Sequence, residues 1–486
     1  MKRILYVMVV VLTGTAFSQI IPLKTVPLAT GEQFLIHPSV NRSMGGVSLA
    51  LDDSLSDPYH NPAAGVLVNG IRVFASPLYY AIGLNEGRSG GSSGSTFPLG
   101  MSFRTGDFFG GLIWARQALS KGDSPGYMGF PRIHSRTISQ PVEEFANTYT
   151  YGMFGFQIPG TSFSAGVSAR WSDLNAMEGV QYLYPNASNL WQQGSIAEYR
   201  AGVRSEWEGE RVLEFLFAHQ STEMKHGYTR QSITLPWDGT MIPMPRDVTE
   251  EDQSNGYALE ASYRQSVTKL LHAGAVLAVD VKTYPKIPNY QLMNIPRDPG
   301  HSIAWNFGIG LANIGEKSVL GLDVIYEPAV SETWAEAESP IMTDGGRTIA
   351  AGDRTVENAF DFYNRTIRFG LRSVIHDIGI GISLHRIKYY LRQTDHIQET
   401  MRRQKEEWTE VTLSLGFGFD VFGGHVKYLG LFTAGTGRPG VEWNGQTIAR
   451  SVTDYTSSFM VAPSGPLTLN EAWTGTHQFS FILSLP

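Results

Sequence analysis

The chain has 486 residues, no cysteine, 52 glycines and 12% aromatic residues, whereas Asp, Glu, Lys and Arg together make up only 17%. The hydrophobic content of 42% excludes a disordered chain, and the lack of cysteine excludes disulfide scaffolds and thiolate metal sites. Because 45 acidic residues outnumber 38 basic ones, the charge balance argues against a nucleic-acid-binding surface.

The amino terminus has the pattern of a secretory signal peptide. Lys2 and Arg3 precede an apolar run at residues 4–12, and small and polar residues follow at 13–18. The apolar run is too short to cross a bilayer as a helix, and no cysteine follows it to carry a lipid. We therefore expect residues 1–18 to be a signal peptide and the protein to be exported.

Residues 19–70 lack sustained alternation and contain several prolines and glycines. We expect this segment to be either a periplasmic extension or a plug that folds into the domain that follows it.

From residue 71 to the end, apolar residues alternate with small or polar ones. In the segment 302–312, for example, Ile303, Trp305, Phe307, Ile309 and Leu311 occupy one phase. Segments 162–172 and 411–420 and the carboxy-terminal run have the same pattern. These strands are about 10 to 14 residues long, which is longer than most strands of soluble proteins. After the leader, no apolar run is long enough for a membrane helix.

Short turns and long loops alternate between these strands. The short turns are expected at residues 105–107, 159–160, 208–210, 313–316, 376–377 and 421–423, and the long loops at 83–95, 120–146, 175–194, 223–255, 285–301, 328–359, 394–407 and 435–474. This layout is typical of an outer-membrane β-barrel. A soluble propeller would show a repeat of about 40 to 50 residues, and sandwich strands would be shorter. We predict an all-β fold: residues 71–486 form a transmembrane antiparallel barrel of about 14 to 16 strands, with both termini on the periplasmic side.

A motif within the amino-terminal segment resembles the signature of the FadL-like outer-membrane barrels, particularly their PorV/PorQ branch. The similar residues run from Asn41 to Gly65, although Ala64 interrupts the usual Asn-Pro-Ala-Gly order. The motif residues are Met44, Gly45, Gly46, Asp52, Asp53, Asn61, Pro62 and Ala63. The resemblance implies a barrel of fourteen strands, whereas the count between breaks is about sixteen. Physically, we expect a tight turn at the glycines, a capped loop at the aspartates and a chain break at Asn-Pro.

If the apolar phase faces lipid, the opposite phase lines the lumen, and it is rich in charge. The expected lumen-lining residues are Glu198, Arg200, Arg204, Glu206, Glu260, Arg264, Asp280, Lys282, Asp323, Arg368, Arg372 and His385. They form either a selectivity lining or a structural network that holds a plug.

Two functions follow from the resemblance, both in the Gram-negative outer membrane and in contact with its lipid. FadL-like proteins carry hydrophobic small molecules across that membrane, and the PorV/PorQ branch includes secretion-system components that dock secreted proteins. For docking, the acidic loop at residues 328–359 is the expected surface. No cofactor or metal site is expected, because the 12 histidines are dispersed.

An enzymatic function is the third class to weigh. His219 and Ser221 lie two residues apart on one strand face, a pair that lipid hydrolases use. Because no third, orienting group is identifiable, we expect interface residues here and a protein that is not an enzyme.

Overall fold

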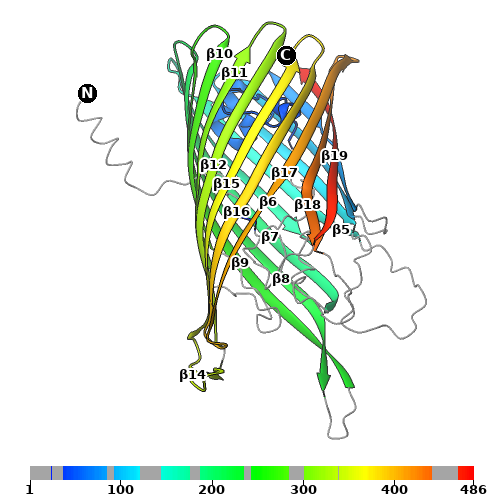
Figure 1. Ribbon diagram of the computed structural model, residues 1–486. Helices are drawn as coiled ribbons and strands as arrows, with labels where there is room; N and C mark the ends of the chain where they lie inside the picture. Colours follow the sequence, from blue (N-terminus) through cyan, green and yellow to red (C-terminus); the bar gives the residue numbers. More distant parts are fainter. Residues whose placement is uncertain are drawn as a thin grey trace.

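The computed structural model describes residues 23–24, 37–84, 92–120, 144–175, 187–234, 242–283, 300–337, 339–439 and 469–485, which form an antiparallel β-barrel (Figure 1). The strands of the barrel are β1 (Ile71–Ala75), β2 (Leu78–Leu84), β3 (Ser92–Thr105), β4 (Phe108–Ser120), β5 (Glu144–Gln157), β6 (Phe163–Leu174), β7 (Ala187–Trp207), β8 (Arg211–Thr234), β9 (Ile242–Ser266), β10 (Leu271–Thr283), β11 (Gly300–Ile314), β12 (Ser318–Glu336), β15 (Arg354–Ser373), β16 (Ile378–Asp395), β17 (Thr400–Val421), β18 (Gly424–Pro439) and β19 (Leu469–Leu485). A small hairpin of β13 (Ile341–Met342) and β14 (Thr348–Ile349) lies between β12 and β15.

The barrel closes where its first and last strands meet. Both β1 and β2 pair with β19 on one side and with β3 on the other, so they occupy one position in the wall. The 17-stranded sheet therefore has sixteen positions, which confirms the count from the sequence rather than the fourteen implied by the resemblance. The break between β1 and β2 falls at Ser76 and Pro77, because proline has no N–H to donate. Hydrogen bonds continue across the break, since Phe479 N donates to Pro77 O at 2.9 Å.

The six short turns predicted from the sequence lie near the expected positions, whereas a further short turn at residues 267–270 was not predicted. At the opposite end of the barrel, the strands are longer than predicted. The loop predicted at residues 394–407 is wrong, because β16 reaches Asp395 and β17 begins at Thr400. Similarly, β8 and β9 take up most of the loop predicted at 223–255. Beyond the bilayer both faces of a strand contact water, so its sequence loses the apolar alternation that marks a lipid-facing strand. We call the two ends of the barrel the turn side and the loop side.

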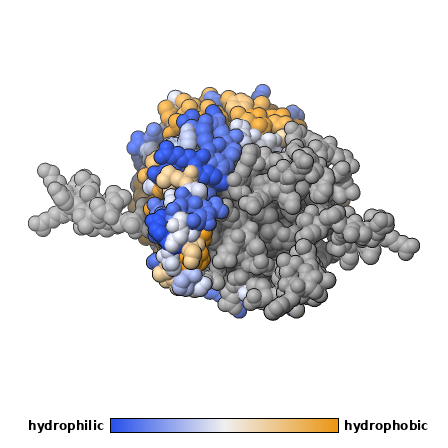
Figure 2. Space-filling view, turned by 60° about the horizontal axis from the view of Figure 1, so that its bottom comes forward, coloured by the Kyte–Doolittle hydropathy of each residue, from blue (hydrophilic) through white to orange (hydrophobic). Residues whose placement is uncertain are grey.

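An apolar belt covers the outer wall. Phe307, Ile309 and Leu311 of β11 are 46%, 66% and 50% exposed, and neighbouring strands present similar side chains outward. Figure 2 shows hydrophobic surface on the wall and mainly hydrophilic surface on the described part of the loop-side end. So large an apolar surface is not stable in water, so the belt is the part of the molecule that contacts lipid.

Among the described residues, no helix combines the length and the apolar composition that crossing a membrane requires.

Residues 37–70, which we call the plug, pack inside the barrel toward the turn side, where the carboxy terminus also lies (Figure 1). The plug contains the short helices η1 (Asn41–Met44), α2 (Asp57–His60) and η2 (Pro62–Leu67). Helix η1 contacts β15 to β18, and η2 contacts β3 to β7. The plug thus spans the lumen from one side of the wall to the other.

Glycines on the inner face of the wall let the plug backbone approach. A Cβ added at Gly166 would lie 2.7 Å from the carbonyl carbon of Pro62, and one at Gly370 would overlap the main chain of Met44. Several of these glycines are register partners: Gly166 pairs with Gly155 and Gly202, and Gly370 pairs with Gly321 and Gly381. These neighbouring glycines leave parts of the inner wall without side chains, and the plug packs against those parts.

We expect Gly370→Ala to loosen the plug. The new methyl group collides with plug backbone, which cannot rotate away, and overpacking of this kind costs about 1–3 kcal/mol. Because the chain has no cysteine, a single Ser54→Cys in the plug reports its exposure through the rate of maleimide labelling. Labelling should be about tenfold faster in Gly370→Ala.

Gly152→Ala is the matched control, because a Cβ at Gly152 meets no atom within 4 Å. Equal labelling rates in the two variants would show that the plug does not depend on this close approach.

Candidate functional site

The first turn of the plug is built on two glycines. Gly45 and Gly46 have φ values of 74° and 78°, which residues with a Cβ atom rarely adopt. The two glycines reverse the chain directly after the buried Met44. The N–H of Gly45 donates to Ser414 Oγ of β17 at 2.8 Å, and Ser414 Oγ donates to Ser43 O at 2.9 Å. Two hydrogen bonds to Ser414 therefore attach the turn to the wall.

The remaining motif residues organise the plug internally. Asp53 is buried, and its carboxylate accepts from Val40 N at 2.7 Å and from Leu55 N at 3.0 Å. Asn61 caps η2, since its Oδ1 accepts from Ala63 N at 3.1 Å, and Pro62 occupies the first position of the helix. Short polar side chains thus satisfy the backbone groups that such a compact segment leaves unpaired.

A cation pair of the wall holds Asp52 of the plug. Arg204 of β7 is buried, and its Nη1 lies 3.2 Å from Asp52 Oδ1, while Arg264 Nη2 of β9 lies 2.6 Å from the same oxygen. Glu214 of β8 contacts both arginines, and Glu206 lies 3.4 Å from Arg204. Burial raises the cost of a charged Asp52, but the two guanidinium groups outweigh this cost and hold its pKa below the usual value.

A second ionic group holds the backbone of α2. Arg200 Nη1 donates to His60 O at 2.8 Å and to Tyr59 O at 3.1 Å. Glu198, which is buried, accepts from Arg200 at 2.7 Å and from Arg170 at 2.8 Å. The wall thus supplies donors to the carbonyl end of this helical turn.

The side chain of His60 contacts the wall. Its Nε2 lies 3.1 Å from Glu260 Oε1 of β9. Burial disfavours the charged imidazole, but the carboxylate of Glu260 has the larger combined effect and raises the pKa of His60.

On the opposite side of the lumen, Asp323 and Arg368 bind plug backbone. Asp323 Oδ2 accepts from Ser48 N at 2.8 Å and from Leu49 N at 3.3 Å. Arg368 Nη1 donates to Gly46 O at 3.2 Å. A wall carboxylate therefore accepts hydrogen bonds from plug N–H groups, and a wall guanidinium donates a hydrogen bond to a plug carbonyl.

The other expected lumen-lining residues lie away from these contacts. Asp280, which is buried, Lys282 and His385 lie on the loop side of the plug, and Arg372 is half-buried on the turn side. His385 lies 3.8 Å from both Glu327 and Glu410. The charged lumen residues thus separate into a group that holds the plug and a smaller group beyond it.

A cleft of about 480 Å³ opens between the plug and the turn-side rim. Its lining is polar and includes Asn69, Arg104, Gln157 and Glu206. Arg104 of β3 donates hydrogen bonds to Val66 O of the plug and to Gln157 Oε1 of β5. Arg104 therefore connects the plug to the wall in this cleft.

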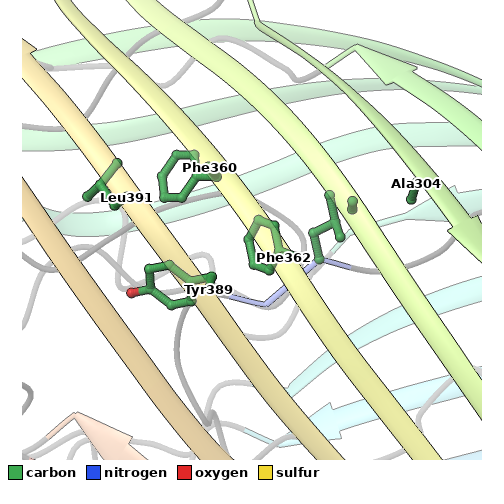
Figure 3. Close-up of a cluster of buried hydrophobic side chains, with 7 residues drawn as sticks. Ala304, Phe360, Phe362, Tyr389 and Leu391 are labelled. Atoms are coloured by element: carbon green, nitrogen blue, oxygen red, sulfur yellow. The ribbon is translucent and has the colours of Figure 1, made fainter.

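On the loop side of the plug, part of the inner wall is apolar. Phe360 and Phe362 of β15 meet Tyr389 and Leu391 of β16, and Figure 3 shows these side chains next to one another on adjacent strands. Two further apolar clusters line other parts of the wall: Leu78, Tyr80, Ile82, Leu119 and Ala472 in one, and Ala115, Tyr149, Leu174, Ile196 and Met224 in the other.

Sequence reasoning did not identify these apolar lumen residues, although a signal was present. Phe360 and Phe362 stand in the same phase of β15 as Arg368 and Arg372. Because apolar side chains on a barrel strand usually face lipid, the phase of the charged half of the strand is the information that places these rings inside.

Of the two residues weighed for hydrolysis, His219 makes contacts of another kind. His219 stacks on Tyr257 with ring centroids 4.6 Å apart, and its Nδ1 lies 3.2 Å from Gly256 O. These are contacts of an interface residue on the outer wall.

Comparison with solved structures finds similar bacterial barrels at low identity. The chain is 11% identical to the Pseudomonas putida toluene transporter TodX over 97% of this chain and 100% of that one, with a TM-score of 0.41. It is 10% identical to the CymD monoaromatic hydrocarbon channel, over 94% and 99%, with a TM-score of 0.43. A Pseudomonas aeruginosa FadL homologue is 10% identical over 97% and 100%, with a TM-score of 0.39.

No protein-family model and no curated protein matches the chain. The structural similarities are too distant to assign a family, and the three structures named do not bear on the PorV/PorQ branch, which stays a prediction.

We expect Arg204→Met to destabilise the folded barrel. Arg204 is 2% exposed, and removing one partner of a buried ionic group typically costs about 3 kcal/mol, because the remaining carboxylates lose their counter-charge. Denaturant unfolding followed by tryptophan fluorescence measures the change. Arg347→Met, which breaks an exposed pair with Glu399, should leave the free energy of unfolding nearly unchanged, because water screens such a pair. Equal losses in the two variants would contradict a structural role for the Asp52 network.

The contribution of Asp57 to stability should fall as the pH rises from about 4 to about 8. Burial and the neighbouring charge of Asp53 raise the pKa of Asp57 from 3.8 to about 8. Between these two pKa values, the folded state holds a proton that the unfolded chain releases. The stability that Asp57 contributes is therefore complete below pH 3.8 and lost above about pH 8. The raised pKa of His60 acts in the same direction at the upper end of this range, whereas burial lowers the pKa of His37, whose contribution to stability rises with pH.

Thermal unfolding across this pH range, compared between the native chain and Asp57→Asn, tests the assignment. The amide cannot titrate, so the variant should show a smaller fall in melting temperature with rising pH. A fall of the same size in both proteins would remove Asp57 as its cause.

Proposed function

We propose that this chain is a non-enzymatic channel of the Gram-negative outer membrane that conducts hydrophobic small molecules passively. The observation that carries the proposal is the apolar inner wall on the loop side of the plug, formed by Phe360, Phe362, Tyr389 and Leu391. The lipid-facing belt supports the membrane location, because it provides the contact that outer-membrane lipid requires.

The distribution of polarity along the lumen favours this cargo. Water-filled barrels have polar interiors, whereas here most of the expected charged lumen residues lie where they hold the plug, and a smaller group that includes Asp280, Lys282 and His385 lies beyond it. A hydrophobic solute that leaves water for an apolar wall gains about 25 cal/mol for each Å² of apolar surface it buries. The lining therefore favours such solutes over sugars or ions.

The plug supports the same interpretation from the other side. It contacts wall strands on opposite sides of the lumen and is held by charged groups, so it restricts the free passage of hydrophilic solutes. A hydrophobic solute must then pass the plug either by loosening it or through the wall.

Docking of secreted proteins is not proposed. A docking face for a large partner has an apolar core. The described part of the loop-side end is mainly hydrophilic in the view of Figure 2.

Phe362→Asn should slow the uptake of a neutral monoaromatic hydrocarbon. The substitution places an amide on the apolar lining and removes ring surface that the solute contacts, so uptake should fall about tenfold for a loss of roughly 1.4 kcal/mol. Uptake of the radiolabelled compound is measured in cells that produce the protein and lack other channels for it.

Asn358→Ala is the matched control, since Asn358 lies in the same phase of β15 but carries a polar side chain. Its uptake should stay near that of the native chain. Unchanged uptake in Phe362→Asn, or no difference between cells with and without the protein, would contradict the proposal.

A further inference from the structure

The apolar cluster around Phe360 and Phe362 already holds a segment of the chain. Leu23 is 6% exposed and packs in this cluster together with Ala304, Ala329 and the four larger side chains of β15 and β16. Figure 3 shows the ring faces from adjacent strands that make up this surface. A single aliphatic side chain from the amino-terminal segment thus occupies the lumen wall beyond the plug.

The next residue places a cation beside a carboxylate of the same site. Lys24 Nζ lies 3.3 Å from both Oε1 and Oε2 of Glu410 on β17. The two side chains are 20% and 10% exposed, so this is a partly desolvated pair. Leu23 and Lys24 together present an apolar group and an ammonium group in adjacent positions.

The carboxylate and the aromatic cluster are physically connected. Trp408 packs against the cluster, its ring lies edge-on to Tyr389 at 6.4 Å, and its Nε1 donates to Glu410 Oε1 at 3.4 Å. On the other side of Glu410, His385 Nδ1 lies 3.8 Å from Oε2. The site therefore combines aromatic faces with one anionic end.

Aromatic rings beside a carboxylate are the surroundings that organic cations prefer. The rings attract a cation through their electron-rich faces, and the carboxylate supplies a charge-assisted hydrogen bond. A carboxylic acid of the same length would meet Glu410 as a like charge. The excess of 45 acidic over 38 basic residues also attracts cations toward the protein as a whole.

We propose that this site binds hydrophobic primary amines, with the apolar body on Phe360, Phe362 and Tyr389 and the ammonium group on Glu410. Leu23 and Lys24 are its intramolecular occupants, which a ligand must displace. This inference rests on the proposed function, because it names a substrate class for the same apolar lining.

Calorimetric titration of the purified full chain in nonionic detergent tests the site, with phenylbutylamine and phenylbutanol as probes. The two compounds share one carbon skeleton and differ in charge. Lys24→Ala removes the internal competitor, so this variant should bind the amine about tenfold more tightly than the native chain does. The variant should also bind the amine about tenfold more tightly than it binds the alcohol.

Glu410→Gln on the Lys24→Ala background should reduce the preference for the amine to less than about threefold, since the ammonium group loses its counter-charge. Glu399→Gln is the matched control, because Glu399 lies outside the lumen in the β16–β17 turn and pairs with Arg347. It should keep the full preference.

Equal binding of amine and alcohol by Lys24→Ala would overturn the inference, as would a preference that survives Glu410→Gln. The comparison of the two probes in Lys24→Ala decides the question even if Glu410→Gln fails to fold. Failure of the proposed function is distinguishable, because it appears as unchanged uptake of a neutral hydrocarbon in Phe362→Asn, whatever the amine does.

Discussion

The close contact between the plug backbone and the inner wall is the constraint on which the rest of the structure depends. Where Pro62 and Met44 meet the wall, only glycine leaves room for their main chain. The approach buries backbone N–H and C=O groups that water no longer reaches, so the wall must bind them. Asp323 and Arg368 do so on one side of the lumen and Arg200 on the other. The charged residues of the lumen are thus a consequence of how closely the plug fits.

The same constraint divides the lumen by depth. At the level of the plug, the inner wall carries glycine, carboxylates and guanidinium groups where it meets plug backbone or an opposite charge, and apolar side chains where it packs against the apolar side chains of the plug. Beyond the plug, Phe360, Phe362 and Tyr389 form an apolar cluster on one part of the wall. This cluster offers a solute an apolar surface, with Glu410 and His385 beside it. This change of lining is what gives the barrel a candidate binding surface distinct from its plug.

Much of the fold follows from local pattern. Alternation in segments such as 302–312 identifies the lipid-facing strands, because a lipid-facing side chain must be apolar while its neighbour points into the lumen. The sixteen positions and the short turns were predictable for this reason. The extensions of β16 and β17 around Glu399 were not, because a strand with water on both faces has no apolar phase. The register of charged side chains also gave the inner face of β7 and β15.

The sequence by itself determined the barrel, the side of the wall that residues in the apolar-alternating strand segments face, and the glycine turn and capping residues of the plug. These properties depend on contacts within one strand or one short segment. Only the tertiary structure decided which lumen residues meet. The pairing of Arg204 with Asp52 joins residues 152 positions apart, and that of Glu410 with Lys24 joins residues 386 apart. Such contacts depend on the closure of the barrel around the plug, which no local period encodes.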